Sequence, residues 1–115
     1  LNIKLVLKNR NFSHSQSFQD LLIISIFENQ PGFFIEAGAC DGKYLSNTYM
    51  LEKKFNWKGL LVEPNRFYWK NLTKNRSCEI FKGAIGSKNG IYDLQSGELR
   101  DGRPEVRERN ERAIQ

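Results

Sequence analysis

The alternation of apolar and polar stretches along the chain predicts short strands separated by helices. Two apolar runs, residues 33–36 and 59–63, are short and end in an acidic residue, and a third strand is expected at residues 79–83. Short apolar runs are typical of strands in a parallel sheet that is covered on both faces. The alternating order predicts an α/β fold whose parallel strands are joined by right-handed crossovers.

Three helices are predicted around these strands. Residues 18–29 follow Ser17, which is suited to be the N-cap, and place Asp20 in the first turn, where the helix dipole favours an acid. Apolar residues cover much of this segment, which predicts a buried helix, although its isoleucines would also suit a strand. The other two helices are expected at residues 46–54 and 66–76. The candidates for the core side of the first of these are Leu45, Tyr49, Met50 and Phe55.

The two ends of the chain differ from its middle. Residues 1–7 alternate apolar and polar positions, which predicts a short strand or an extended arm. From Gly97 onward every basic residue is arginine and apolar residues are few, so we expect a flexible tail or, from Pro104, a solvated helix. The predicted organisation is an N-terminal arm at 1–14, one α/β domain at 15–96 and a charged tail at 97–115.

Composition narrows the classes of protein. The 115 residues carry a net charge of +5, but the basic residues are spread along the chain and no base-reading or stacking motif accompanies them, so nucleic acid is not an expected partner. No apolar run approaches the ~18 residues of a membrane span. Two cysteines are too few for a disulfide framework or a zinc site, so we expect reduced thiols, no metal and a cytoplasmic location.

The candidate chemistry lies in the turn after the first strand. Glu36 ends that strand, and the small residues that follow let a ligand lie against its tip, with amides ahead of the next helix able to donate to it. A dinucleotide-binding turn would need glycines where Cys40 and Lys43 stand. A phosphate-binding P-loop would need four residues between its glycines, whereas three separate Gly38 from Gly42.

A second acid supports a nucleotide-like ligand. Glu63 ends the second strand 21 positions after Gly42, close to the interval of about 20 expected for an acid that accepts from both ribose hydroxyls. Structural roles stay open for the acids: Glu36 accepting amide bonds, Asp41 capping the next segment, and Glu63 solvated in a loop. His14 is the only histidine and lies in a polar loop, so a surface role is favoured and no catalytic base is assigned.

The acid-x-Gly-x-x-x-Gly turn resembles the first motif of class I S-adenosylmethionine-dependent methyltransferases. The segments SQSFQD, FFIEAGACDG, LSNTYMLEK, WKGLLVEPN and KGAIGS, between about Ser15 and Ser87, resemble the FkbM-type methyltransferase family. This resemblance implies a Rossmann-like fold, S-adenosyl-L-methionine as cofactor, and O-methylation of a hydroxyl on a sugar or natural product. Residues 15–96 would then be the N-terminal part of such a domain, with its first three or four strands.

The resemblance also implies the cofactor-binding residues, which are Glu36, Gly38, Asp41, Gly42, Glu63, Ala84 and Ile85. Glu36 would lie near the amino-acid end of the cofactor and Gly38 would make room for its methionine portion. Ala84 and Ile85 would lie near the adenine. Ser15, Gln16 and Asp20 would close the mouth of the pocket.

Other functions stay open. One is a truncated, non-catalytic Rossmann-like fragment that binds only a nucleotide cofactor or a partner. Another is a nicotinamide-dependent enzyme, which the missing glycines disfavour, and a third is a basic nucleic-acid module. An open three-stranded sheet would expose an apolar edge and face, so a partner or self-association that covers them is expected.

Overall fold

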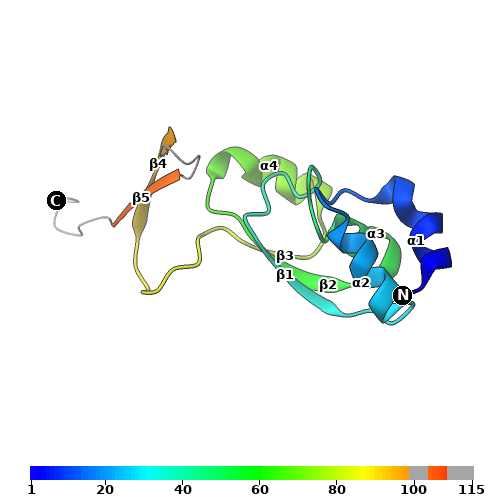
Figure 1. The fold of residues 1–115 in the computed structure, drawn as a ribbon. Coiled ribbons are helices and arrows are strands. Elements are labelled where there is room, and N and C mark those ends of the chain that lie inside the picture. Colours follow the sequence, from blue (N-terminus) through cyan, green and yellow to red (C-terminus); the bar gives the residue numbers. More distant parts are fainter. Residues whose placement is uncertain (99–103, 109–115) are drawn as a thin grey trace. The chain divides into compact units, whose positions relative to one another are not determined.

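The structure is a computed structural model that describes residues 1–98 and 104–108 (Figure 1). The chain divides into two compact units, Leu1–Ala84 and Ile85–Gln115, and each is described by itself. The candidate chemistry predicted from the sequence falls almost entirely in the first unit.

The first unit is an α/β unit with a parallel sheet. Its elements in chain order are α1 (Ile3–Asn9), η1 (Arg10–Phe12), α2 (Gln19–Phe27), β1 (Phe33–Ala37), α3 (Tyr49–Phe55), β2 (Lys58–Val62), α4 (Arg66–Asn75) and β3 (Glu79–Phe81). The sheet order is β1-β2-β3, and Ile35 of β1 lies beside Leu60 of β2, which lies beside Glu79 of β3. The predicted α/β fold with a parallel sheet and flanking helices is confirmed, together with its three strands.

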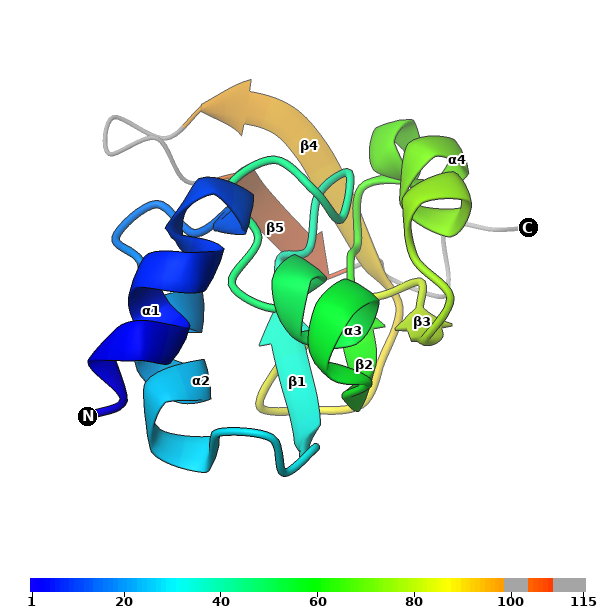
Figure 2. The same cartoon turned by 90° about the vertical axis from the view of Figure 1, so that its right-hand side faces the viewer.

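The core lies on one face of this sheet, where α3 covers the strands (Figure 2). Phe34 and Leu61 of the sheet pack there with helix residues that include Leu51 and Leu72. On the opposite face the apolar side chains of the outer strands are exposed. Ile35 of β1 is 66% exposed, and Phe33 of β1 and Phe81 of β3 are exposed as well. The prediction that both faces are covered is therefore wrong for the outer strands, although Val62 of the central strand is buried. Right-handed crossovers that step in one direction along a sheet bring their helices to the same face.

The helix α2 begins one residue later than predicted and is capped differently. Phe18 is its N-cap residue, in the left-handed region with φ 58°, and Ser15, not Ser17, accepts the amide of Asp20 through its hydroxyl at 3.1 Å. Asp20 lies in the first turn as predicted, fully buried. Only one side of the helix is covered, with Leu21 and Ile24 in the core and Leu22 exposed, so the prediction of a well-buried helix holds for half of it.

The later helices occur where they were predicted, with small differences. α3 begins at Tyr49, three residues after the predicted start, and α4 matches its predicted range to within one residue. Of the core candidates, Met50 is buried and Phe55 packs at the margin of the core, but Leu45 is exposed. Leu45 lies in the loop before the helix, with φ 55°. Its position on the core side was predicted from helical periodicity, which does not apply to a loop residue.

The first residues form a helix, and the predicted strand or extended arm is wrong. The side chain of Asn2 caps α1 by accepting the amide of Leu5 at 3.1 Å. Leu5 and Val6 face the core and α1 packs against α2. Ile3 is also three positions from Val6 and four from Leu7, a spacing that suits one face of a helix, so this pattern did not separate strand from helix.

The second unit contains β4 (Tyr92–Glu98) and β5 (Pro104–Glu108), which pair antiparallel with Leu94 beside Val106. The predicted helix from Pro104 is therefore wrong, since that residue begins a strand. The rest of the predicted tail, 99–103 and 109–115, lies outside the described residues. In the part of the chain that the structure describes, none of the helices combines the length and apolar character needed to cross a membrane.

Candidate functional site

A hollow of about 290 Å³ lies at the carboxyl end of β1, where the sequence predicted a ligand. It is lined by Glu36, Gly38, Ala39, Cys40, Asp41, Tyr44, Leu45, Ser46 and Tyr68. Three predicted cofactor residues, Glu36, Gly38 and Asp41, are therefore brought together. Its size is near the lower end for small-molecule sites, and no residue of its lining is basic.

The two glycines of the turn have different surroundings. Both are in the left-handed region, with φ 75° at Gly38 and 80° at Gly42. A Cβ on Gly38 would meet no atom within 4 Å, so the space beside it is open to a ligand. A Cβ on Gly42 would lie 2.6 Å from side-chain atoms of Leu72 and Arg76, so this glycine allows α4 to pack against the turn. Gly42 is buried behind the hollow and does not line it.

Most amides of the turn are already engaged within the protein. Gly38 and Ala39 both donate to the carbonyl of Val62, and Cys40 donates to Glu63. Further along the turn, the amide of Gly42 donates to the carbonyl of Ala39, and the amides of Lys43 and Tyr44 donate to Asp41 Oδ1. The expectation that the turn amides donate to a ligand is thus wrong for these residues. The hollow offers mainly carboxylate and hydroxyl groups instead.

Asp41 has one oxygen committed and one available. Its Oδ1 accepts the amides of Lys43 and Tyr44 at 2.9 and 2.8 Å, which is the capping role left open by the sequence. Its Oδ2 makes no hydrogen bond with any residue that the structure describes. Asp41 therefore shapes the turn with one oxygen and leaves the other for a ligand.

Glu63 lies under the turn and not in the hollow. Its side chain is bound at both oxygens: Oε2 accepts the amide of Cys40 at 2.8 Å and Oε1 accepts the amide of Asn65 at 3.0 Å. The residue is 4% exposed and does not line the hollow. The solvated-loop alternative is therefore wrong, and in this conformation Glu63 joins the end of β2 to the turn after β1.

Glu36 is held by the segment that precedes α3. Its Oε2 accepts the hydroxyl of Thr48 at 2.6 Å and that of Ser46 at 3.1 Å, and its Oε1 accepts the amide of Asn47 at 3.0 Å. The amide-accepting role that the sequence left open is thus present. Because Glu36 also lines the hollow, the same carboxylate faces the hollow and holds its wall through Ser46, Asn47 and Thr48.

A buried ion pair behind the hollow was missed by sequence reasoning. The side chain of Arg76 has no exposed surface, and its Nε donates to Glu52 Oε2 at 2.5 Å. Its Nη2 donates to Thr48 at 2.9 Å, and Nη1 lies 3.7 Å from Glu36. Burial alone would raise the pKa of Glu52, but hydrogen bonds and the charge of Arg76 outweigh it and hold the pKa below its ordinary value.

Both cysteines are free thiols in the structure, as predicted. Burial, followed by the charges of Glu63 and Asp41, raises the pKa of Cys40 above 9.0. Burial and then the charge of Glu52 raise the pKa of Cys78 to about 11. Both therefore stay protonated near pH 7, which disfavours a thiolate nucleophile although Cys40 lines the hollow.

The remaining predicted site residues of the first unit are not part of the lining of the hollow. Ala84 is exposed and does not line it, and Ile85 is 70% exposed in the second unit, so their predicted position near an adenine stays a prediction. Ser15, Gln16 and Asp20 are also absent from its lining, although Ser15 donates to the carbonyl of Ser46 at 3.4 Å.

His14 lies outside the hollow as well. Its Nδ1 is 2.8 Å from the carbonyl of Phe12, and its ring packs on Tyr49 with 4.6 Å between the ring centres. The sequence favoured a surface role for His14, and the structure places it half-buried against Tyr49.

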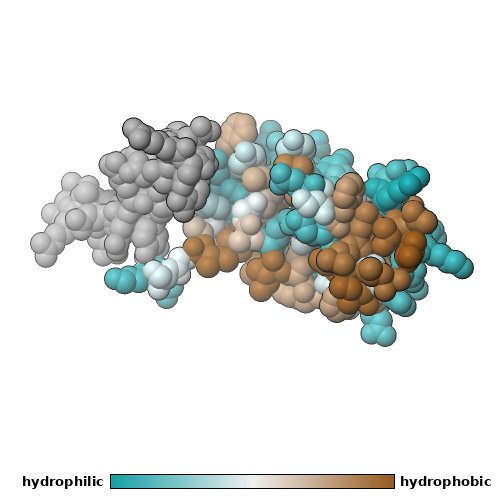
Figure 3. Space-filling view, in the orientation of Figure 1, coloured by the Kyte–Doolittle hydropathy of each residue, from teal (hydrophilic) through white to brown (hydrophobic). Residues whose placement is uncertain are grey.

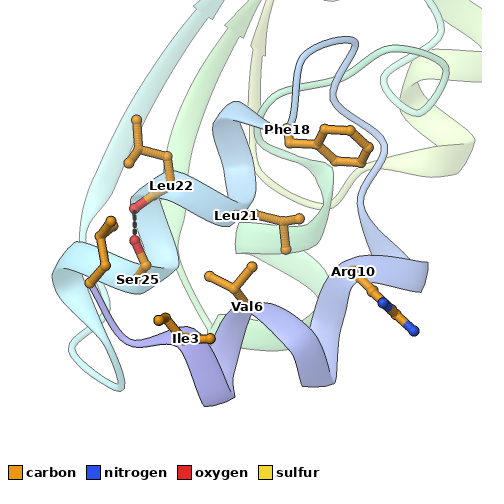
Figure 4. A pocket seen from close by; sticks show the side chains of 8 residues that line it. Ile3, Val6, Arg10, Phe18, Leu21, Leu22 and Ser25 are labelled. Carbon is orange, nitrogen blue, oxygen red and sulfur yellow. Dashed lines mark hydrogen bonds between the residues drawn. The ribbon is translucent and has the colours of Figure 1, made fainter.

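A second hollow, of about 460 Å³, lies between α1 and α2 (Figure 4). It is lined by Leu1, Ile3, Val6, Arg10, Phe18, Leu21, Leu22 and Ser25. The hydroxyl of Ser25 donates to the carbonyl of Leu22, and no carboxylate lines this hollow. Apolar side chains also gather on the outer surface of this part of the unit (Figure 3). This hollow is larger, but its lining is mostly apolar and contains no carboxylate. We therefore assign the candidate site to the hollow at β1.

Comparison of the chain with family models, with curated proteins and with solved structures gives no match.

Proposed function

We propose that the hollow at the end of β1 binds S-adenosyl-L-methionine and that the protein is a methyltransferase acting on oxygen. The observation that carries the proposal is the chemistry of the hollow: Glu36 and Asp41 line it and no basic residue does. A ligand with ammonium and sulfonium charges suits such a lining. A dinucleotide or nucleoside triphosphate would bring phosphates next to two carboxylates, with turn amides that are already engaged.

The residues of the hollow suggest how the cofactor would be held. Asp41 Oδ2 and the carboxylate of Glu36 would face the ammonium group of its amino-acid end, and the open space at Gly38 would take its methionine chain. Tyr44 and Tyr68 bring aromatic rings that can attract a sulfonium through their faces. When bound, S-adenosyl-L-methionine supplies a methyl group that is already activated for transfer. The protein's task is then to orient an acceptor, which can contribute several kcal/mol.

The acceptor class comes from the resemblance, which points to a hydroxyl on a sugar or natural product. Such an acceptor must lose a proton, and the two carboxylates that line the hollow, Glu36 and Asp41, are assigned to the cofactor. We therefore assign no catalytic base.

The test is calorimetric titration with S-adenosyl-L-methionine, S-adenosylhomocysteine, NAD and ATP. The Asp41→Asn variant keeps the oxygen that accepts the amides of Lys43 and Tyr44 but removes the charge. We expect this variant to bind S-adenosyl-L-methionine about fivefold more weakly, because a solvated charge pair contributes ~1 kcal/mol. The matched control, Glu79→Gln, removes an exposed acid of β3 and should leave binding unchanged. Tighter binding of NAD or ATP than of S-adenosyl-L-methionine and S-adenosylhomocysteine would overturn the proposal.

A second candidate is a domain that binds the cofactor or a partner without catalysis. It is favoured by the uncovered apolar face of the sheet, where Phe33, Ile35 and Phe81 are exposed. Cofactor binding without methyl transfer to any hydroxyl acceptor would support this candidate, whereas transfer to a sugar hydroxyl would exclude it.

A further inference from the structure

The turn that shapes the candidate site has a backbone that needs external support. Cys40 and Leu45 are non-glycine residues in the left-handed region, with φ 51° and 55°, and Gly38 and Gly42 are also at positive φ. Backbone of this kind persists only where surrounding groups hold it, and such strain gathers at ligand sites. The groups that hold this turn therefore decide whether the hollow keeps its shape.

The C-terminal end of α4 supplies two of these groups. The side chain of Asn75 donates to the carbonyl of Asp41 at 2.8 Å, and Nη1 of the adjacent Arg76 donates to the carbonyl of Gly42 at 3.0 Å. Two successive side chains thus bind two successive carbonyls, 34 residues back along the chain. Neither Asn75 nor Arg76 lines the hollow.

Arg76 is itself immobilised, so the support is anchored in the core. Its side chain is fully buried and is bound by Glu52, while the same guanidinium reaches Ser46 at 3.3 Å and Thr48 at 2.9 Å. Ser46 and Thr48 are also the groups that hold Glu36, so the same guanidinium supports the turn at Gly42 and the segment that holds Glu36.

We propose that Asn75 and Arg76 are positioning residues, which hold the turn at residues 38–44 in the shape that accepts the ligand. The affinity of the site then depends on two side chains that never touch the ligand. This inference rests on the proposed function for the identity of the ligand, but not for the state of the turn.

Asn75 is the residue to vary, because removing the buried Arg76 would leave Glu52 unpaired in the core and endanger the fold. Asn75→Ala removes the donor to Asp41, and Asn75→Asp keeps the shape but places an acceptor against that carbonyl. Lys74→Ala is the matched control, since Lys74 is an exposed neighbour on the same helix end. All are made in a Cys78→Ser background so that Cys40 is the single thiol.

Two measurements are made on each folded variant: the affinity for S-adenosylhomocysteine and the rate at which iodoacetamide alkylates Cys40. Cys40 lies in the turn and lines the hollow, so its alkylation reports the turn without any ligand. We expect Asn75→Ala and Asn75→Asp to weaken affinity about three- to tenfold, the effect of one lost hydrogen bond, and to speed alkylation. Lys74→Ala should change neither, and urea unfolding of each variant shows that it remains folded.

The outcomes separate this inference from the proposed function. Absence of binding by the parent protein would overturn the proposed ligand, and the alkylation rate alone would then decide the positioning role. Unchanged alkylation in Asn75→Ala would overturn that role whatever the affinity does. Faster alkylation with unchanged affinity would also overturn it, because the turn would then move without affecting the site.

Discussion

The carboxylate of Glu63 accepts the backbone amide of Cys40 at 2.8 Å, so the acid that follows the second strand holds the turn that follows the first. These groups are 23 residues apart in the chain. Because the carboxyl ends of parallel strands β1 and β2 meet at one edge of the sheet, a side chain from one can fix the loop of the other. The interval between the turn and Glu63, which suggested a ribose ligand, thus also places Glu63 where its carboxylate can hold the turn.

Substitution of Glu63 by Gln should destabilise the protein. The side-chain amide of glutamine has one accepting oxygen in place of two, so the backbone amide of either Cys40 or Asn65 loses its partner in a partly buried place. We expect the free energy of unfolding in urea to fall by about 1–3 kcal/mol. Glu79→Gln, on an exposed acid, is the control and should have little effect. Equal stability of the two variants would show that Glu63 does not hold the turn.

The two turn glycines should respond differently to alanine. Gly38→Ala meets open space, so its loss of stability is limited to the left-handed backbone, about 1–2 kcal/mol. Gly42→Ala carries the same backbone term and also places a methyl group 2.6 Å from Leu72 and Arg76, which adds about 1–3 kcal/mol. Urea unfolding should therefore rank Gly42→Ala as the less stable variant. The reverse order would contradict the packing role of Gly42.

Those glycines also show which parts of the site were predictable. The turn could be located from the sequence because its signals are local: an apolar run, an acid and small residues within a few positions. Glu36, Gly38 and Asp41 accordingly meet in one hollow. That Gly42 serves α4 while Gly38 faces open space depends on Leu72 and Arg76, which are distant in the chain, and no local pattern carries that information.

The ion pair of Arg76 and Glu52 illustrates the same limit. Each residue reads as an ordinary surface charge, one near the end of a helix and one within another, and 24 residues separate them. Their burial follows from how α3 and α4 pack on the sheet. The hydrophobic pattern also could not predict that only one face of the sheet is covered by helices. A short apolar run looks the same whether one or both of its faces are buried.

The single covered face leads to a prediction for the sheet. Ile35 is 66% exposed on the open face, whereas Leu61 is fully buried on the covered one. Leu61→Ala should lower the free energy of unfolding by about 2–5 kcal/mol, as for other buried leucines. Ile35→Ala should cost at most about 1 kcal/mol, from strand propensity. Urea titrations of both variants test this, and comparable losses would mean that another group covers Ile35 in solution.

The thiols give a prediction that needs no knowledge of the ligand. With a pKa of about 11 in place of 9.0, Cys78 has about a hundredfold less thiolate at pH 8 than an ordinary cysteine. In Cys40→Ser protein its alkylation by iodoacetamide should be slower by at least that factor, and should accelerate as pH rises toward 11. Denatured protein serves as the reference for each pH. A native rate close to the denatured one would contradict the burial of Cys78 against Glu52.

Acid should weaken the fold through Glu52. Arg76 and the amide of Cys78 outweigh burial and hold the pKa of Glu52 below its ordinary 4.5 in the folded protein. The unfolded chain therefore takes up a proton at higher pH than the folded one does. The stabilisation from this group is complete well above pH 4.5 and is lost as the pH falls from there through the lowered folded pKa.

Comparison with Glu52→Gln isolates this effect from the other acids. At pH 7 the variant leaves the buried Arg76 without the carboxylate that accepts from its Nε, and Glu36 3.7 Å from Nη1 remains its acidic neighbour, so the free energy of unfolding should be lower by about 3 kcal/mol. As the pH falls to 3, the parent protein loses its advantage and the gap between the two should narrow. Urea unfolding at intervals of pH measures the gap, with Glu79→Gln as an exposed control whose gap stays near zero. A gap that is the same at pH 3 and pH 7 would mean that the Glu52 carboxylate does not stabilise the fold through its charge.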